Sequence, residues 1–158
     1  MGRALLVIGW LGTAGLIAAG VVGYRLPGGG LTNHLLLGLV ASLLILFSHC
    51  WILFYLVGTG KAVKDAVRAH GLSADLVAAT RRFKHQSNPW MLLAMLLVMA
   101  TFVVGGGVQT KVVSSWVHHA LFCAALPAQL FTLVIEHRVL GANHRLLTDL
   151  DHHLRRAA

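Results

Sequence analysis

Charged residues are scarce in this sequence, and acidic residues are scarcer still. Asp, Glu, Lys and Arg together make up 11% of the 158 residues, and Glu136 is the single glutamate. Soluble domains carry about 25% charged residues, so the chain lacks the polar surface that a water-soluble globule of this size needs. The shortage of acidic side chains also disfavours a carboxylate-rich di-iron site and a cation transporter.

Recognisable chemical motifs are equally scarce. The two cysteines, Cys50 and Cys123, lie in apolar runs at different expected depths, so a disulfide between them is not expected. The sequence contains no CxxC, HExxH or ExxH pattern and no visible pair of nucleophile and base. A dedicated zinc site, or an enzyme that works on its own, therefore has no sequence signature here.

Long apolar runs are abundant instead. Hydrophobic residues make up 57% of the chain, and the mean hydropathy is +0.75. A helix of about 20 apolar residues spans a bilayer, and four runs qualify, at residues 4–23, 35–57, 90–108 and 112–135. The sequence therefore predicts an all-α fold with one membrane domain over residues 1–158, an integral membrane four-helix bundle of up-down topology.

The 13 Lys and Arg residues are divided unevenly between the two expected sides of the membrane. Arg25 and Lys111 fall in the short loops after the first and third spans, and the other cations fall near the termini and in residues 59–88. Because cytoplasmic segments carry an excess of Lys and Arg, we expect both termini and residues 59–88 to be cytoplasmic and the protein to lie in the inner (cytoplasmic) membrane. Topology and contact with anionic lipids account for the net charge of +8, so no nucleic-acid partner is expected.

The cytoplasmic segments are predicted to be helical. The helix of the second span is expected to start at an N-cap formed by Thr32 or Asn33 and to continue into the cytoplasm as far as a C-cap at Gly71. Ser73 is expected to cap a short helix over residues 74–85, which Asn88-Pro89 separates from the third span. The third span is expected to end at the glycines 105–107.

The C-terminal segment 136–158 is predicted to form a further helix. Leucine recurs there at every seventh position, at Leu140, Leu147 and Leu154. A short heptad pattern of this kind is typical of coiled-coil packing. The expected partner of this segment is the cytoplasmic extension of the second span or another membrane protein subunit.

Four of the ten histidines lie within or at the edge of an expected span: His34, His49, His118 and His119. Ionisable groups at membrane depth face the protein interior and are candidates for function. His49 is expected to face inward as a neutral imidazole. It is then either an interhelical clamp, bonded to Thr13, Thr101 or Gln129, or a contact to a cofactor.

Two arrangements of these histidines would hold haem b. In the first, His34 pairs with His118 or His119, because these residues lie at similar depth on parallel spans and haem iron binds one imidazole on each face. Arg25 and Lys111 then lie on the side where the haem propionates emerge. In the second arrangement, His49 forms an axial pair with Met95 or Met99, which lie near its depth on the third span.

His49 with the neighbouring Trp51 is also the expected contact for a quinone. No metal other than haem iron is expected.

Four spans with histidines on facing helices are similar to the plan of small four-span cytochrome b subunits and of the membrane anchors of succinate dehydrogenase, although no diagnostic motif of those families is present. The resemblance implies haem held near a quinone. We therefore expect a small multi-pass subunit of a larger respiratory or photosynthetic electron-transfer complex, with other membrane protein subunits and lipids as partners. The main alternative is a non-catalytic accessory subunit whose histidines are structural, and a small transporter is a less favoured one.

Overall fold

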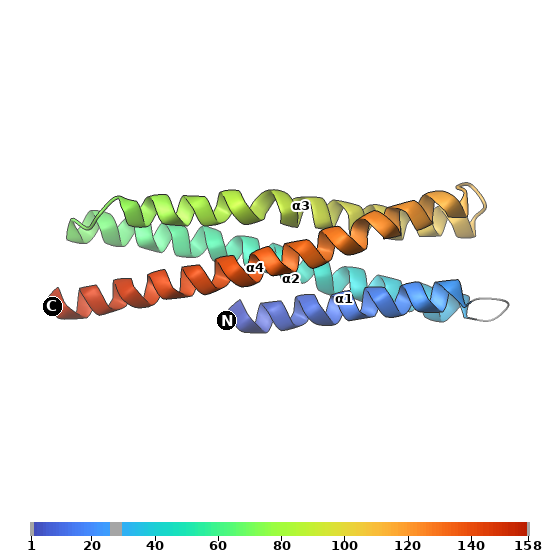
Figure 1. The fold of residues 1–158 in the computed structure, drawn as a ribbon, viewed down its shortest axis with the longest axis horizontal. Coiled ribbons are helices and arrows are strands. Elements are labelled where there is room, and N and C mark those ends of the chain that lie inside the picture. Colours follow the sequence, from blue (N-terminus) through green and yellow to red (C-terminus); the bar gives the residue numbers. More distant parts are fainter. Residues whose placement is uncertain (1, 26–29, 158) are drawn as a thin grey trace.

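The structure is a computed structural model that describes residues 2–25 and 30–157, and in this part of the chain it consists of four long helices (Figure 1). Their bounds are Gly2–Tyr24 for α1, Leu31–His70 for α2, Asp75–Gln109 for α3 and Ser115–Ala157 for α4. All four are long and apolar enough to cross a membrane. The expectation of an all-α chain with four candidate spans is confirmed.

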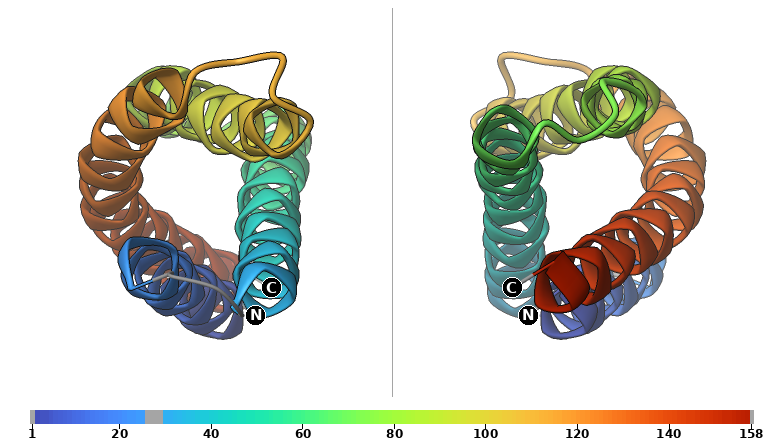
Figure 2. Two further views of the ribbon diagram at one scale, coloured as in Figure 1. Left: turned by 90° about the vertical axis from the view of Figure 1, so that its right-hand side faces the viewer. Right: turned by 90° about the vertical axis from the view of Figure 1, so that its left-hand side faces the viewer.

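The helices form a ring in which each packs against its neighbours in the chain and α4 closes onto α1 (Figure 2). The pairs α1–α2 and α3–α4 make the most extensive contacts, so the bundle consists of two helical hairpins, called here the first and second hairpin. The two connections within the hairpins lie at one end of the bundle, the two-loop end. The α2–α3 connection and the C-terminus lie at the other, the C-terminal end (Figure 1).

The distribution of polar and apolar side chains is the reverse of that in a water-soluble bundle. Large apolar side chains such as Leu11, Phe54 and Val103 are exposed on the outside, whereas Thr13, Gln129 and other polar groups are fully buried. A soluble protein of this size does not expose apolar surface on every helix. The helices therefore have the outside of a chain solvated by lipid and a partly polar interior.

The helices run further without interruption than the sequence suggested. Helix α3 continues through Pro89, so the expected break at Asn88-Pro89 is wrong, and it passes the glycines 105–107 to end at Gln109. A proline removes one backbone N–H from a helix. A full break in an apolar environment would leave many more backbone groups without hydrogen bonds, so the continuous helix has the lower free energy.

Some of the expected helix ends are confirmed and others are wrong. Gly71 caps α2 in the left-handed conformation, with φ of 64°, as expected. The expected N-caps Thr32 and Asn33 instead lie inside the first turn, because α2 begins at Leu31 without a side-chain cap. Ser73 accepts the N–H of Asp75 at 3.2 Å, at the start of the single long α3 rather than of a separate short helix.

The interior is layered along the bundle axis. One apolar cluster, the upper cluster, lies toward the two-loop end and contains Leu16, Ala41, Ile45, Val98 and Ala125. A second, the lower cluster, lies toward the C-terminal end and contains Leu5, Leu6, Ile52, Leu56, Met91, Val139 and Leu140. Between them is a polar layer formed by Thr13, Ser48, His49, Gln129, Thr132 and Glu136, all of them buried.

The two hairpins bury corresponding positions. In α1, the buried residues Leu5, Gly9, Gly12, Thr13, Leu16 and Ala19 correspond to the buried α3 residues 82 positions later, Ser87, Met91, Ala94, Met95, Val98 and Thr101. In α2, Ala41, Ile45, Ser48, His49, Ile52 and Leu56 correspond to the buried α4 residues 84 positions later, Ala125, Gln129, Thr132, Leu133, Glu136 and Leu140. The bundle therefore has an internal two-fold pseudosymmetry about its long axis, which the sequence alone did not reveal.

Close packing within the first hairpin depends on glycines of α1. A Cβ atom added at Gly12 would lie 2.8 Å from Cγ1 of Ile45 and 3.1 Å from its backbone nitrogen. Small residues allow two helix backbones to approach closely in an apolar environment. Gly12 is therefore required for the contact between α1 and α2.

We expect Gly12→Ala to lower the free energy of unfolding by about 1–3 kcal/mol, because the added methyl group forces the backbones apart. Gly58→Ala is the matched control, since a Cβ atom there meets no atom within 4 Å. The control should be neutral or stabilising by up to about 1 kcal/mol, as alanine favours a helix over glycine. Unfolding in mixed detergent micelles, followed by circular dichroism, measures both. Equal stability of the two variants would contradict the assigned contact.

Candidate functional site

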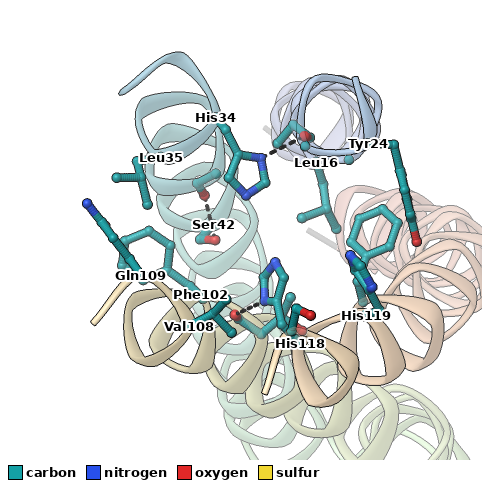
Figure 3. A pocket seen from close by; sticks show the side chains of 18 of the residues that line it. Leu16, Tyr24, His34, Leu35, Ser42, Phe102, Val108, Gln109, His118 and His119 are labelled. Atoms are coloured by element: carbon teal, nitrogen blue, oxygen red, sulfur yellow. Dashed lines mark hydrogen bonds between the residues drawn. The ribbon is translucent and has the colours of Figure 1, made fainter. Parts of the chain in front are cut away.

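A cavity of about 340 Å³ lies inside the bundle near the two-loop end (Figure 3). Its walls come from all four helices and are mostly apolar, with Leu16, Phe102 and Phe122 among them. Its polar lining includes His34, His118 and His119. A largely apolar cavity of this volume with a few convergent polar groups is typical of a small-molecule site.

His34 is held in one orientation by the first hairpin. It lies in the first turn of α2, and its Nδ1 donates a hydrogen bond of 2.9 Å to the backbone carbonyl of Ala19 in α1. A Cβ atom at Gly23 would come within 2.9 Å of this imidazole ring. Glycine at position 23 therefore makes the room that the ring occupies.

His118 is held in the same way by the second hairpin. Its Nδ1 donates a hydrogen bond of 3.0 Å to the backbone carbonyl of Thr101 in α3. A Cβ atom at Gly105 would lie 3.0 Å from the ring. Glycine, carbonyl and imidazole thus recur as a unit in each hairpin.

The pseudosymmetry relates the two units residue by residue. Ala19 and Gly23 correspond to Thr101 and Gly105 by the same shift of 82 positions, and His34 corresponds to His118 by the shift of 84 that relates α2 to α4. One imidazole from each hairpin is therefore placed at the same depth. An arrangement repeated in both halves of the bundle is more than the incidental packing of two polar residues.

The hydrogen bonds fix the chemical state of both rings. A carbonyl oxygen can only accept, so each Nδ1 carries a proton, and in the neutral ring each Nε2 then presents a lone pair. The second nitrogen of each ring points into the space between the helices (Figure 3). The ring centroids are 6.1 Å apart with the ring planes nearly perpendicular, at 88°. Two neutral Nε2 atoms oriented by Nδ1–H···O=C bonds are the usual state of histidine ligands to a metal.

The other residues expected at this end lie around the cavity or outside it. The imidazole of His119 stacks on the ring of Tyr24, with centroids 5.1 Å apart, at the cavity wall. Arg25 and Lys111 are exposed at the two-loop end. Trp51 and Met99 are 42% and 48% exposed on the outside of the bundle and do not line the cavity.

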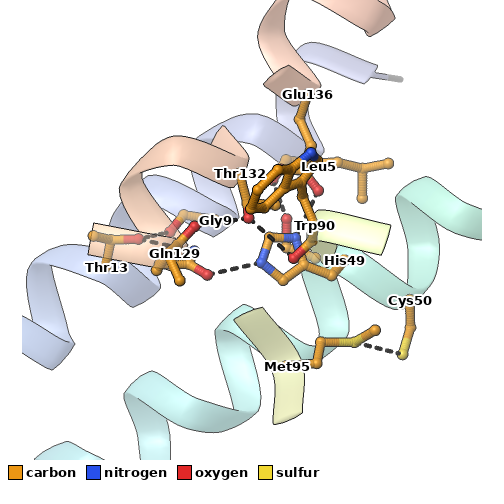
Figure 4. A network of polar contacts seen from close by, with 12 residues as sticks. Leu5, Gly9, Thr13, His49, Cys50, Trp90, Met95, Gln129, Thr132 and Glu136 are labelled. Atoms are coloured by element: carbon orange, nitrogen blue, oxygen red, sulfur yellow. Dashed lines mark hydrogen bonds and ion pairs between the residues drawn. The ribbon is translucent and has the colours of Figure 1, made fainter. Parts of the chain in front are cut away.

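His49 lies apart from the cavity, in the polar layer (Figure 4). Its side chain is fully buried, as expected. Its Nδ1 is 2.6 Å from Oε1 of Glu136, and its Nε2 is 2.8 Å from Oε1 of Gln129. Both partners are on α4, so these bonds cross the diagonal of the bundle and join the two hairpins at its centre.

Glu136 is the functional candidate that the sequence reasoning missed. Hydropathy placed the end of the fourth span at residue 135, which left the carboxylate just outside the membrane. In the structure α2 begins at Leu31 and α4 at Ser115, so His49 and Glu136 are 18 and 21 residues from the helix starts and lie within about one turn of each other in depth. Counting from helix starts, rather than from hydropathy limits, would have paired them.

Comparisons with known proteins add no functional information: no family model, no curated protein and no solved structure matches the chain. Among the described residues, no group of three or more His, Cys, Asp or Glu side chains is placed to hold a metal ion. Any metal at the cavity would therefore need most of its ligands from another molecule.

We expect the His49–Glu136 pair to behave as a coupled unit. His49→Leu and Glu136→Leu should each destabilise the bundle by about 3 kcal/mol or more. The first leaves Glu136 and Gln129 without their hydrogen bonds to the imidazole, and the second leaves His49 without its carboxylate. The double variant should be less destabilised than the sum of the two, since two apolar side chains of similar size can pack together. Unfolding in mixed micelles measures this cycle. Strictly additive losses would show that the two side chains do not interact.

Proposed function

We propose that this protein binds haem b between His34 and His118 and carries electrons within the membrane, as a small subunit of a larger respiratory or photosynthetic complex. The observation that carries the proposal is the pair of symmetry-related imidazoles whose Nδ1 atoms are fixed by backbone carbonyls. Haem, when bound, would supply the redox-active iron. His34 and His118 would hold it through their Nε2 atoms, and the chain would provide their orientation and an apolar enclosure.

The spacing of the rings supports a metal between them. A metal bound to two imidazole nitrogens at about 2 Å from each separates those nitrogens by about 4 Å. Ring centroids 6.1 Å apart leave a gap of that order when the nitrogens face each other. Because the described side chains offer two ligands here and no cluster of three, a metal that brings its own macrocycle fits better than a bare ion.

A quinone is a weaker candidate for the same place. Two lone-pair acceptors would suit the hydroxyl groups of a quinol, but the quinol ring and two hydrogen bonds of about 2.8 Å need a much wider separation. The rings of His34 and His118 are too close for that. A purely structural role, as in an accessory subunit, would leave both Nε2 lone pairs without a metal or a hydrogen-bond donor.

The rim of the cavity supports haem rather than an uncharged ligand. Arg25 and Lys111, the two cations at this end of the bundle, are exposed beyond the apolar walls. Haem carries two propionates, which cations at a membrane surface stabilise. Tyr24 and Gln109 add polar groups at the same rim.

We expect the purified protein, expressed in haem-replete cells, to show the reduced-minus-oxidised spectrum of a low-spin bis-imidazole haem. His34→Gly and His118→Gly should each abolish that spectrum, because each removes one axial ligand. Free imidazole added to either variant should restore it, which separates ligand loss from misfolding.

His119→Ala and His49→Gln are the matched controls, since these histidines are assigned to the wall and to the polar layer, and glutamine keeps a hydrogen-bonding group in that layer. Both variants should retain the haem spectrum. Loss of the spectrum with His49→Gln, together with its survival in His118→Gly, would move the haem to the alternative site. A colourless wild-type protein would leave the accessory-subunit role as the better proposal.

The membrane orientation is part of the same proposal. We place the two-loop end outside, because Arg25 and Lys111 are the only Lys and Arg side chains there among those that the structure describes, and we place the C-terminal end in the cytoplasm of an inner-membrane protein. In a background without Cys50 and Cys123, a cysteine at Thr110 should react with an impermeant maleimide added to intact cells. A cysteine at Ser73 should react only after lysis. Labelling of Ser73 in intact cells would reverse the orientation.

A further inference from the structure

We propose that His49 and Glu136 form a proton-binding site in the polar layer, in which Oε2 of Glu136 takes up a proton that arrives from the C-terminal end of the bundle. The ligand is a proton delivered by water. The proposal stands on the hydrogen-bond geometry of the layer and on the unpaired atoms around it, and it does not depend on haem.

The hydroxyl of Thr13 fixes the first part of the network (Figure 4). Thr13 donates its single proton to the carbonyl of Gly9 at 2.8 Å, so its oxygen can only accept from Gln129, whose Nε2 lies 3.1 Å away. The amide of Gln129 must therefore present its oxygen to His49. Because that oxygen is an acceptor, Nε2 of His49 carries a proton.

The second part of the network holds a further proton. Nδ1 of His49 and Oε1 of Glu136 are 2.6 Å apart, and an imidazole nitrogen and a carboxylate oxygen approach so closely only with a proton between them. With this proton present, the pair carries no net charge. Without it, two lone pairs would face each other and leave a net negative charge in an apolar interior. This shared proton is therefore a fixed component of the structure.

The remaining oxygen of the carboxylate is the open position. Oε2 of Glu136 is buried and has no hydrogen-bond partner among the described residues. A buried acceptor without a partner is costly. A water molecule that donates to Oε2 relieves that cost, and the same water is the acceptor that an O–H group at Oε2 needs. A hydronium ion from the solvent delivers the proton and leaves as water, so that an O–H bond forms at Oε2 while the shared proton stays on Nδ1 of His49. This gives an imidazolium and a neutral carboxylic acid and raises the net charge of the pair from zero to +1, which the apolar interior disfavours, so uptake requires acidification.

A buried polar residue lies beyond this position toward the C-terminal end. Asn143 lies two turns further along α4 than Glu136, is buried, and has its Nδ2 unpaired among the described residues. The half-buried hydroxyl of Thr59, which donates to the backbone carbonyl of Tyr55 at 2.9 Å, lies 3.4 Å from its Oδ1. Leu140 of the lower cluster lies between Glu136 and Asn143 on α4, and Leu56 of the same cluster lies between their partners His49 and Thr59 on α2. These leucines must move to admit water, so exchange is expected to be slow and gated.

The other groups around the carboxylate are not titratable. His49 from α2 is its ion-pair partner, α1 contributes Leu5 and Leu6 at this level, and α3 contributes Met91. Among the described side chains in this layer, His49 is therefore the ionisable partner of the Glu136 carboxylate.

Because Glu136 is the single glutamate, isotope labelling reports on it selectively. Protein grown with glutamate labelled with ¹³C at the carboxyl carbon, and reconstituted in lipid bilayers, should give one carboxyl resonance in solid-state NMR. Acidification should shift this resonance from the carboxylate to the carboxylic acid position. His49→Gln should move the midpoint of that shift by at least one pH unit. A carboxyl resonance that does not change between pH 9 and pH 4 would overturn the proposal.

The direction from which the proton arrives is tested by exchange of the shared proton in D₂O, read from the Nδ1 signal of ¹⁵N-labelled His49. Leu140→Ala should accelerate exchange at least tenfold, and Asn143→Leu should slow it. Ile45→Ala is the matched control, because it opens a similar volume in the upper cluster on the opposite side of the pair. Exchange accelerated by Ile45→Ala and not by Leu140→Ala would overturn the assigned direction. Neither measurement involves the cavity residues, so a protein that fails to bind haem still gives a decisive answer.

Discussion

The bundle depends on one constraint: a polar group inside a helix bundle with an apolar exterior finds no water and must be satisfied by the chain itself. The hydrogen bonds of His49 to Glu136 and Gln129 meet this constraint across the diagonal between α2 and α4. They also fix the relative depth of the two hairpins, because a slip of one turn would leave an imidazole, an amide and a carboxylate unpaired. In lipid, where apolar contact gives little preference for one register over another, such polar contacts supply the specificity.

The pseudosymmetry is kept where the histidines of the cavity lie and is broken in the polar layer. His34 and His118 are equivalent, and so are the carbonyls and glycines that hold them. In the polar layer the equivalents of Gln129 and Glu136 are Ile45 and Ile52, and the equivalent of His49 is Leu133. One half of the layer thus provides the imidazole and the other half its two partners. This division gives a complementary pair, whereas a symmetric layer would place two imidazoles or two carboxylates together.

Apolar length and charge asymmetry were sufficient to predict the four helices, because a hydrophobic run in lipid has few alternatives to a helix. The sequence also indicated that His34 lies at the depth of His118 and His119, since all three lie near helix starts on parallel spans, but it did not decide which of the two faces His34. The internal repeat did not follow from the sequence, because buried equivalents such as Gly9 and Met91 share a position but no side-chain chemistry. Glu136 was missed because hydropathy counts a carboxylate as a helix-ending charge and cannot see the imidazole that neutralises it.

The cavity and the polar layer lie on the same axis but are separated by the upper cluster. His34 and His49 are 15 residues apart on α2, which corresponds to about 22 Å along a helix. Two unit charges at that distance interact by on the order of 1 kcal/mol at the effective dielectric constant of about 20 that fits most protein sites. Reduction of a haem at the cavity removes one positive charge, so it would favour a proton on Glu136 by about that amount. This interaction is strong enough to couple reduction of the haem to protonation of Glu136, and it is too weak to make either process require the other. The upper cluster, which carries no titratable group, separates the proposed haem site from the proposed proton site within one bundle.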